Sequence, residues 1–313
     1  MITVRPSNTA NHSPPYKLIR MKPVTTLLVL LLLLQVASAQ DDIMKALPDS
    51  AVKKEYITGA FKSSRVINGH SIEMIGAGVL DFRILHRFGP VNQGVSQFFG
   101  LDQASMRLGF DYGLTNNFTI GIGRTTTKKE LDGFLKYRLL RQSAGGGSSV
   151  AIVLVAGMSV QTYKNIDPAK EVSFNLRTGY YYQAIIGRKF SPRFTVQLSP
   201  TLVHRNEVSA ADVNDVFAAG IGARYKFSKR MALVVDYFYV TNGLPHSAGS
   251  NPLSVGVDIE TGGHVFQLHF SNTSGMNERA FITETTNKWG KGDIQFGFNL
   301  SRVFNVKKKK LPA

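Results

Sequence analysis

Charged side chains recur at every second position in several segments of this chain, and large apolar side chains fill the positions between them. Alternate residues of a strand lie on opposite faces, so each such segment would have one charged face and one apolar face. The charged set is Asp81, Arg83, Arg87, Arg107, Asp111, Asp132, Lys136, Arg138, Arg224, Lys226 and Asp236. Seven of these residues are basic and four are acidic. If they line an aqueous path, the basic excess favours anionic solutes, as rings of charge do in channels.

The same residues allow a second interpretation, in which the charges pair with one another and fill a closed interior. The candidate partners are Asp81 and Arg83 on one predicted strand and Arg107 and Asp111 on the next, which would pair across the two adjacent strands. A barrel of about eight strands just encloses its side chains, whereas about sixteen strands leave an aqueous channel, so an intermediate size leaves both interpretations open. The residues selected as lining the interior are Arg83, Arg87, Arg107, Asp111, Lys136, Arg138, Arg224 and Asp236.

The segment His269-Phe270-Ser271-Asn272 resembles the His-x-Ser-Asn element of outer-membrane phospholipases, which would indicate a catalytic serine and histidine. Those barrel enzymes need a serine on the lipid-facing side, with a histidine beside it to take the proton. Here Phe270 and its apolar neighbours claim that side, which turns His269 and Ser271 inward. We therefore expect no catalytic residue and no enzyme activity.

No cofactor or metal site is expected either. His264 and His269, together with Asp258 and Glu260, match no compact ligand spacing for a metal. The glycine-rich run 145–148 lacks the lysine and the following helix that a phosphate-binding loop requires.

The alternating segments predict strands that span a membrane. In residues 104–112, Met, Leu, Phe and Tyr occupy the even positions, while Ser, Arg, Gly and Asp occupy the odd ones from 105 to 111. Twelve strands are predicted, at 79–88, 103–113, 117–126, 130–141, 149–160, 177–188, 193–204, 215–226, 230–240, 263–271, 277–284 and 293–304. The fold class is therefore all-β, a transmembrane antiparallel β-barrel of about twelve strands. Without the weak segment 277–284 the count falls to ten, and a soluble secreted β-sandwich is the alternative fold.

The lengths of the links support a barrel. Bacterial barrels have short periplasmic turns, longer outer loops and both termini on the periplasmic side. Thr115-Asn116, Ser191-Pro192 and Ser228-Lys229 are tight turns that follow even-numbered strands, and so fall on one side. The longer links 89–102, 161–176, 205–214, 241–262 and 285–292 all fall on the other side.

The N-terminus has the layout of an export signal. A basic start at Met21 precedes an apolar run and Ala37-Ser38-Ala39, which predicts a cleaved signal peptide at 21–39. Residues 1–20 are then expected to be an upstream start artefact. Residues 40–78 lack clean alternation and are left as a periplasmic segment or a plug. Residues 79–304 form the barrel, and 305–313 form a basic tail.

Composition limits the partners. The formal charge of +16 falls to +12 without residues 1–39, which carry four basic residues and no acidic one. Because the basic residues are scattered and the chain is predicted to be exported, we expect membrane lipid and small solutes as partners, and no nucleic acid. The chain has no cysteine, so its rigidity cannot come from disulfides.

The last predicted strand places Phe296, Phe298, Leu300 and Phe304 on one face. This pattern resembles the signal read by the barrel assembly machinery of the outer membrane. We predict that machinery as a partner in assembly.

Several motifs resemble one uncharacterised outer-membrane β-barrel family of Bacteroidetes-type bacteria, described as a domain of unknown function. They are Gly78 to Gly89, Phe99 to Ala104, Gly121 to Arg124, Gly262 to Leu268 and Phe298 to Phe304. The resemblance implies an outer-membrane barrel and carries no site residues. From the residues themselves we predict a passive channel for small solutes, anionic ones included. The alternatives are a non-conducting structural or partner-binding barrel and, third, a barrel lipid hydrolase.

Overall fold

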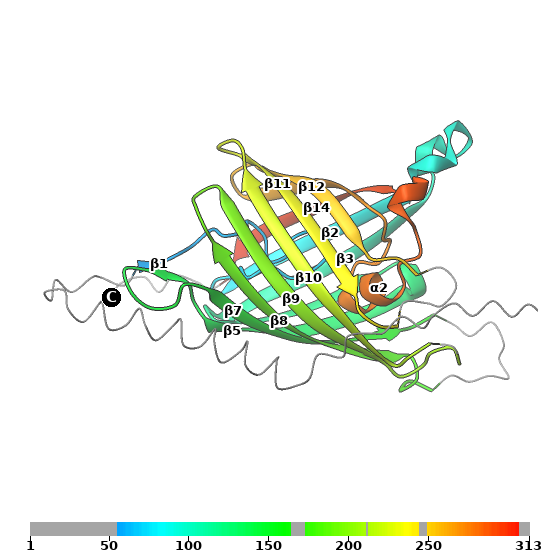
Figure 1. Cartoon of the computed structure of the whole chain (residues 1–313), viewed down its shortest axis with the longest axis horizontal. Coiled ribbons are helices and arrows are strands. Elements are labelled where there is room, and N and C mark those ends of the chain that lie inside the picture. Colours follow the sequence, from blue (N-terminus) through cyan, green and yellow to red (C-terminus); the bar gives the residue numbers. More distant parts are fainter. Residues whose placement is uncertain (1–54, 164–172, 211, 244–248, 307–313) are drawn as a thin grey trace, which may run out of the picture. The chain divides into compact units, whose positions relative to one another are not determined.

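A computed structural model describes residues 55–163, 173–210, 212–243 and 249–306. Twelve strands form a closed antiparallel barrel, in which each strand pairs with the next along the chain and the last pairs with the first (Figure 1). They are β2 (Val79–Pro90), β3 (Ala104–Thr115), β4 (Phe118–Thr125), β5 (Glu130–Leu140), β7 (Ala151–Gln161), β8 (Thr178–Lys189), β9 (Phe194–Arg205), β10 (Asp215–Lys226), β11 (Met231–Val240), β12 (Leu253–Glu260), β13 (His264–Ser271) and β14 (Gln295–Asn305). The all-β barrel of about twelve strands predicted from the sequence is thereby confirmed.

The remaining elements are short. They are β1 (Glu55–Tyr56) and β6 (Ser143–Ala144), which pair with each other, the helix α2 (Glu278–Thr283), and the 3-10 turns η1 (Val91–Gln93), η2 (Val95–Gly100), η3 (Thr127–Lys129) and η4 (Trp289–Lys291). Among the described residues, no helix has the length and apolar character needed to cross a membrane. The predicted start artefact and signal peptide lie outside the described residues, as do residues 40–54 and 307–313.

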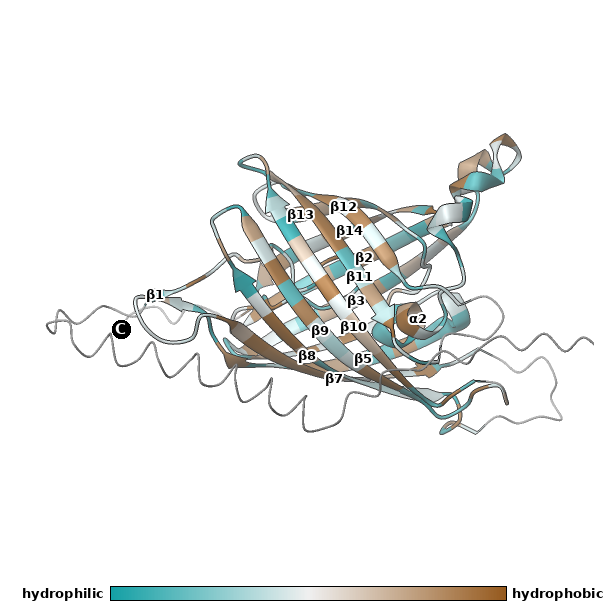
Figure 2. Ribbon diagram, viewed as in Figure 1, coloured by the Kyte–Doolittle hydropathy of each residue, from teal (hydrophilic) through white to brown (hydrophobic). Residues whose placement is uncertain are grey.

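Strand periodicity produces two chemically distinct wall faces. In β3, Arg107 and Asp111 are buried in the interior, while Leu108 and Phe110 are 38% and 46% exposed on the outer wall. Figure 2 shows the resulting alternation of hydrophilic and hydrophobic bands along the strands. A wall that exposes large apolar side chains in this way matches a surface in contact with lipid.

One predicted strand is wrong. Residues 277–284 form α2, because the Asn277 side chain caps the helix by accepting a hydrogen bond from the Ala280 amide, and Phe281 and Ile282 are consecutive rather than alternating. The missing strand is β12, which lies within the predicted link 241–262. In this strand, small or polar residues alternate with Leu253, Val255, Val257 and Ile259.

The links divide into two sets, which define two ends of the barrel. Among the described residues, the long-link end carries 91–103, 126–129, 162–163, 173–177, 206–210, 212–214, 241–243, 249–252 and 272–294. The short-turn end carries residues 116–117, 141–150, 190–193, 227–230 and 261–263.

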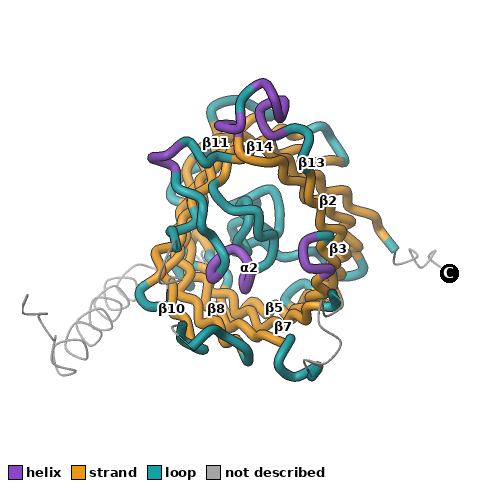
Figure 3. Tube along the Cα trace, turned by 90° about the vertical axis from the view of Figure 1, so that its right-hand side faces the viewer, coloured by secondary structure: helices purple, strands orange, loops and turns teal. Residues whose placement is uncertain are grey.

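Two inserts enter the barrel. Residues 57–78, called the plug here, pass into the interior from the short-turn end and turn back where the Val66 amide donates to the Gly69 carbonyl. The helix α2 enters from the long-link end, and Figure 3 shows both inside the ring of strands. The interior is therefore filled by chain segments as well as by wall side chains.

The lipid-facing assignment predicts the effect of an added charge. Leu198, near the middle of β9, is 54% exposed, and Phe194, at the short-turn end of the same face, is 41% exposed. Arginine costs about 2–4 kcal/mol at the bilayer midplane and about 0–1 kcal/mol near the interface. Leu198→Arg should therefore lower the free energy of unfolding in lipid far more than Phe194→Arg. Equal losses, measured by urea titration in vesicles, would contradict this placement.

Candidate functional site: the occupied barrel interior

The structure places most of the predicted lining residues inside the barrel. The side chains of Arg83, Arg87, Arg107, Asp111, Lys136, Arg224 and Asp236 are all buried there. Arg138 is half-buried near the short-turn end, as is Lys226. The site is thus a closed polar interior at the position where the sequence predicted either a pore lining or a salt-bridged filling.

Some wall charges are neutralised within the wall. Arg107 binds Asp132 of β5 through two bonds, of 2.8 Å from Nε and 2.5 Å from Nη2, and not a residue of β2, the neighbouring strand that the sequence predicted as its partner. A glycine on the intervening strand makes this possible, since a Cβ at Gly123 would lie 2.2 Å from Arg107 Nη2. Arg83 forms its ion pair with Asp81 of its own strand, at 3.3 Å.

A third wall group joins β10 to β12. Arg224 Nη2 lies 3.1 Å from Glu260 Oε1, and Arg224 Nε lies 3.7 Å from Asp258 Oδ2. Neither acidic residue was predicted to line the interior, because both fall within the predicted link 241–262. Glu130, at the start of β5, is a further inward acid outside the predicted set.

Other wall charges are held by the plug instead. Lys136 Nζ donates to the carbonyl oxygens of Ser64 and Glu73, at 3.0 and 2.6 Å. Asp236 Oδ2 accepts from the amides of Asn68 and Gly69, each at 2.8 Å. The plug backbone thus provides partners that water would provide in an open lumen.

The tip of the plug reaches the same wall region through side chains. Arg87 Nη2 donates to Asn68 Oδ1 at 2.8 Å, and Arg87 Nη1 donates to Asn299 Oδ1 at 2.9 Å. Asn68 Nδ2 also donates to Ser254 Oγ at 2.8 Å. No acidic residue pairs with Arg87 among the described residues.

The two inserts meet at a buried ion pair. Arg65 Nη1 of the plug lies 2.9 Å from Glu278 Oε1 of α2, and both side chains are almost fully excluded from solvent. His70 Nε2 lies 3.2 Å from the Tyr181 hydroxyl and 3.5 Å from Glu278 Oε1. We call the Arg65–Glu278 contact the latch, because it joins the insert from one end to the insert from the other.

An apolar cluster occupies part of the inner face of β7 to β11. Its wall members include Val153, Val155, Ile185, Val203, Val216, Phe238 and Val240, and they lie among polar inward residues such as Gln183, Gln197 and Thr201. Phe61, Val66 and Ile72 of the plug and Phe281 and Ile282 of α2 belong to the same cluster. Alternation could not reveal this cluster, since runs such as 152–155 are apolar on both faces.

A second set of ion pairs anchors α2 at the long-link end. Arg279 lies 2.8 Å from Glu130 and 2.6 Å from Glu284, and Lys128 lies 2.9 Å from Glu284. Burial raises the pKa of Glu284, but the charges of Arg279 and Lys128 outweigh it, so the pKa of Glu284 falls below its ordinary value. Glu284 is therefore ionised at neutral pH.

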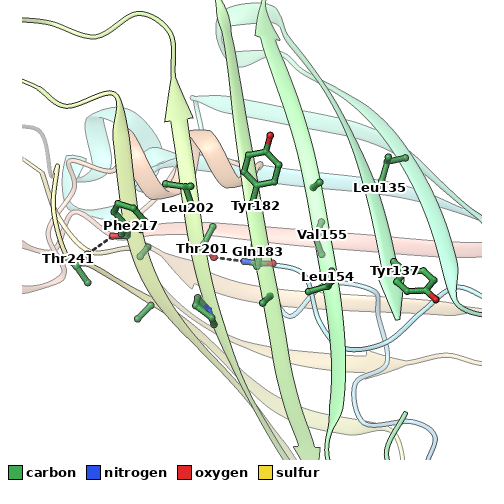
Figure 4. A pocket seen from close by; sticks show the side chains of 15 residues that line it. Leu135, Tyr137, Leu154, Val155, Tyr182, Gln183, Thr201, Leu202, Phe217 and Thr241 are labelled. Atoms are coloured by element: carbon green, nitrogen blue, oxygen red, sulfur yellow. Dashed lines mark hydrogen bonds between the residues drawn. The ribbon is translucent and has the colours of Figure 1, made fainter. Parts of the chain in front are cut away.

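The cavities in the described part of the chain include three that differ in position. A cavity of about 290 Å³ at the short-turn end is lined by residues that include Lys62, Asp81 and His264. Another of about 240 Å³ lies at the long-link end beside α2. The largest, about 700 Å³, is an apolar hollow on the outer wall between Tyr182, Leu202 and Phe217 (Figure 4). This hollow belongs to the lipid-facing surface, so the two interior cavities are the candidates for contact with solutes.

The catalytic candidates lie inside the barrel. His269 and Ser271 are buried on the inner face, where Ser271 accepts a hydrogen bond from the Ser254 hydroxyl at 2.7 Å. Neither ring nitrogen of His269 has a hydrogen-bond partner in the described structure. No group of three or more metal-ligating side chains occurs within the described ranges.

The residues of the predicted assembly signal lie on the outer face of β14. Phe296, Phe298 and Leu300 are half-buried there, and Phe304 is exposed. Phe298 stacks on His86, and Phe296 stacks on Phe88 of the neighbouring strand. Their role in assembly stays a prediction.

Solved barrels resemble this fold only distantly. The KdgM porin is 9% identical with a TM-score of 0.43, over 72% of this chain and 99% of the porin. A COG4313 outer membrane channel from Pseudomonas putida F1 is 14% identical with a TM-score of 0.46, over 75% of this chain and 98% of the channel. Outer membrane phospholipase A from Escherichia coli is 9% identical with a TM-score of 0.39, over 71% of this chain and 92% of the enzyme.

A family match covers most of the barrel. No protein of curated function matches the sequence. The membrane bound beta barrel domain DUF5777 matches residues 61–304, a span that begins within the plug and ends in β14. The match confirms the predicted resemblance to a membrane β-barrel family. The chain therefore belongs to the DUF5777 family of membrane-bound β-barrel domains.

Proposed function

We propose that this protein is an outer-membrane channel for small solutes, held closed by the plug and α2. The observation that carries the proposal is that wall charges such as Lys136 and Asp236 are satisfied by plug backbone rather than by other wall residues. Barrels of about eight strands fill their interior with side chains, so a twelve-stranded wall needs an insert to close it. Water can replace the plug's hydrogen bonds at a net cost of only about 0.5–1.5 kcal/mol each.

The orientation follows from the link lengths. The short-turn end would face the periplasm and the long-link end the cell surface, as in bacterial barrels. Export would use the signal at 21–39, and folding would use the assembly machinery through β14. The plug would then enter from the periplasm, and α2 from the cell surface.

The proposed charge preference is weak. The buried inward basic residues are Arg83, Arg87, Arg107, Lys136 and Arg224, and the inward acids are Asp81, Asp111, Glu130, Asp132, Asp236 and Asp258. This near balance replaces the basic excess counted from the sequence, because Asp258 and Glu130 add acidic groups and because Arg138 and Lys226 are only half-buried. We propose small polar solutes rather than strictly anionic ones, and no catalytic role, since His269 and Ser271 are kept from lipid.

A non-conducting structural barrel is the second candidate. The apolar cluster of Phe61, Val66 and Ile72 with the β7 to β11 wall favours it, because withdrawing the plug would expose those side chains to water. Conductance of the full-length protein and of a variant without the plug, measured in planar lipid bilayers, separates the two candidates. The channel proposal fails if neither protein conducts.

A further inference from the structure

A further cavity, of about 450 Å³, lies at the short-turn end and has a lining rich in hydrogen-bond donors. Arg138 near the end of β5 and Arg141 in the following link line it, together with Asn116 and Asn117 of the turn after β3. The asparagines are exposed and the arginines are half-buried, so a ligand can reach all four side chains. Tyr56 of β1, the strand that pairs with the same link, also lines the cavity (Figure 1).

Neither arginine of this cavity has an acidic partner. Arg138 and Arg141 form no ion pair and donate no side-chain hydrogen bond among the described residues. Glu73 attracts Arg138 only from beyond ion-pair distance, and its Oε1 accepts from the amides of Ala60 and Phe61. No acidic residue within the described ranges lines the cavity. Two guanidinium groups and two side-chain amides, without a carboxylate, favour an anion with several acceptor oxygens, such as a phosphate group.

A β-bulge in β5 brings the two arginines to the same cavity. The ladder between β5 and β7 skips Leu139, which has no partner on β7. Strict alternation would turn Leu140 inward with Arg138 and would turn Arg141 outward. The extra residue reverses this order, because Leu140 is exposed and Arg141 lines the same cavity as Arg138. Bulges at the rims of barrels re-aim side chains in this way.

The cavity lies at the level where lipid head groups are expected. Phe118 and Tyr137 are sequence neighbours of two lining residues and face each other on the outer wall, with their ring centroids 6.4 Å apart. Such aromatic side chains mark the boundary between acyl chains and head groups. Leu139 and Leu140, both exposed, line the cavity as well. A cationic lining therefore adjoins an apolar one, which suits a molecule with an anionic head and apolar tails.

We propose that this cavity binds the phosphate group of an anionic phospholipid. Arg138 and Arg141 hold the phosphate oxygens, while Leu139 and Leu140 contact the carbon chains next to the head group. The Arg141 guanidinium carbon lies 4.5 Å from the centroid of the Tyr56 ring, a cation–π contact that leaves its N–H groups available. Two positive charges without a carboxylate favour a lipid of net negative charge over a zwitterionic one. The inference concerns a lipid contact and does not depend on whether the barrel conducts.

The test is native mass spectrometry of the folded full-length barrel, titrated with single lipids. Dioleoylphosphatidylglycerol should bind as one molecule, roughly tenfold or more tightly than dioleoylphosphatidylcholine. Inorganic phosphate at the same concentration should not displace it, because a free ion makes no contact with the leucines. Arg138→Gln and Arg141→Gln should each weaken phosphatidylglycerol binding about ten- to hundredfold, through the loss of hydrogen bonds to a charged group. Arg141 lies outside every strand, so its variant keeps the wall ladder intact.

The matched control is Arg193→Gln. Arg193 is an exposed basic residue in the link after β8, at the same end of the barrel but outside this cavity. Diffuse attraction to anionic lipid is worth about fivefold per basic residue, so this variant should lose about fivefold at most. Heat-dependent gel mobility checks the fold of each variant, and Arg141→Gln alone decides if Arg138→Gln does not fold.

Four results would overturn the site. Equal affinity for the two lipids would remove the preference for an anion, and displacement by inorganic phosphate would make the cavity a site for a small anion. Unchanged binding in the folded arginine variants would place the lipid elsewhere. An equal loss in Arg193→Gln would mean that the attraction is diffuse.

Discussion

A variant that lacks residues 57–75 is expected to conduct ions in planar bilayers for most of the recording time, whereas the full-length barrel opens rarely. The deletion removes the segment that contacts Lys136, Arg87 and Asp236, and so leaves these wall side chains to be hydrated by water. Residues 76–78 are kept because the Gly78 amide donates to the Gly113 carbonyl and Val306 donates back to Gly78. The wall ladder itself is then complete, since every strand keeps both neighbours.

The deletion needs a fold check and a matched control. Retained heat-dependent gel mobility would show that the shortened chain still forms a barrel. Replacing residues 95–98 by a Gly-Ser segment changes an exposed link outside the lumen and should leave conductance at the full-length value. A folded deletion variant that stays silent would mean that the interior is closed by the wall and α2 alone, and would support the structural alternative.

Glu278→Ala is expected to open the barrel without removing any of the plug. Removing one partner of a buried ion pair costs about 3–5 kcal/mol, because the other charge is left without compensation. Arg65 would keep its contacts with the Asn68 carbonyl, His70 and the Phe134 ring, none of which is anionic. At about 1.4 kcal/mol per factor of ten, even the lower figure raises the ratio of undocked to docked plug roughly a hundredfold. Open probability in bilayers and amide exchange of the plug should rise together.

Lys62→Ala provides the comparison for the latch. Lys62 also joins the plug to the barrel, through a 2.9 Å pair with Glu260, but its side chain is 39% exposed. Exposed pairs contribute about 0–1 kcal/mol, so this variant should open little more than the full-length barrel. Similar behaviour of the two variants would show that the latch does not hold the plug.

The wall could be predicted from sequence because its signal is local. Alternation in segments such as 104–112 fixes both the strand and the face that each residue takes. The same reasoning missed β12, although its residues alternate as they do in the other strands, and it failed at 277–284, where a cap residue and two consecutive apolar residues direct a helix.

The filling of the interior could not be predicted in the same way. The latch joins residues 213 positions apart, and no periodicity in the plug links Arg65 to α2. Arg107 was expected to pair across to the adjacent strand that carries Asp81 and Arg83, yet it crosses β4 on its other side to reach Asp132, because Gly123 leaves the space. Such contacts depend on how far one strand lies from another across the barrel, which only the closed structure defines.

A reversible disulfide between the plug and the wall shows directly whether the plug holds the barrel closed. The chain has no cysteine, and the short side chains of Asn68 and Ser254 are joined by a 2.8 Å hydrogen bond, so Asn68→Cys with Ser254→Cys can tie the plug tip to β12. The control pair Ser254→Cys with Ser271→Cys joins two facing wall residues and leaves the plug free. Both pairs are placed in the Glu278→Ala barrel, and conductance is recorded before and after reduction. If the plug closes the barrel, only the Asn68–Ser254 pair should silence the oxidised barrel, and reduction should restore its openings. Equal conductance of the oxidised and reduced forms of that pair would contradict it.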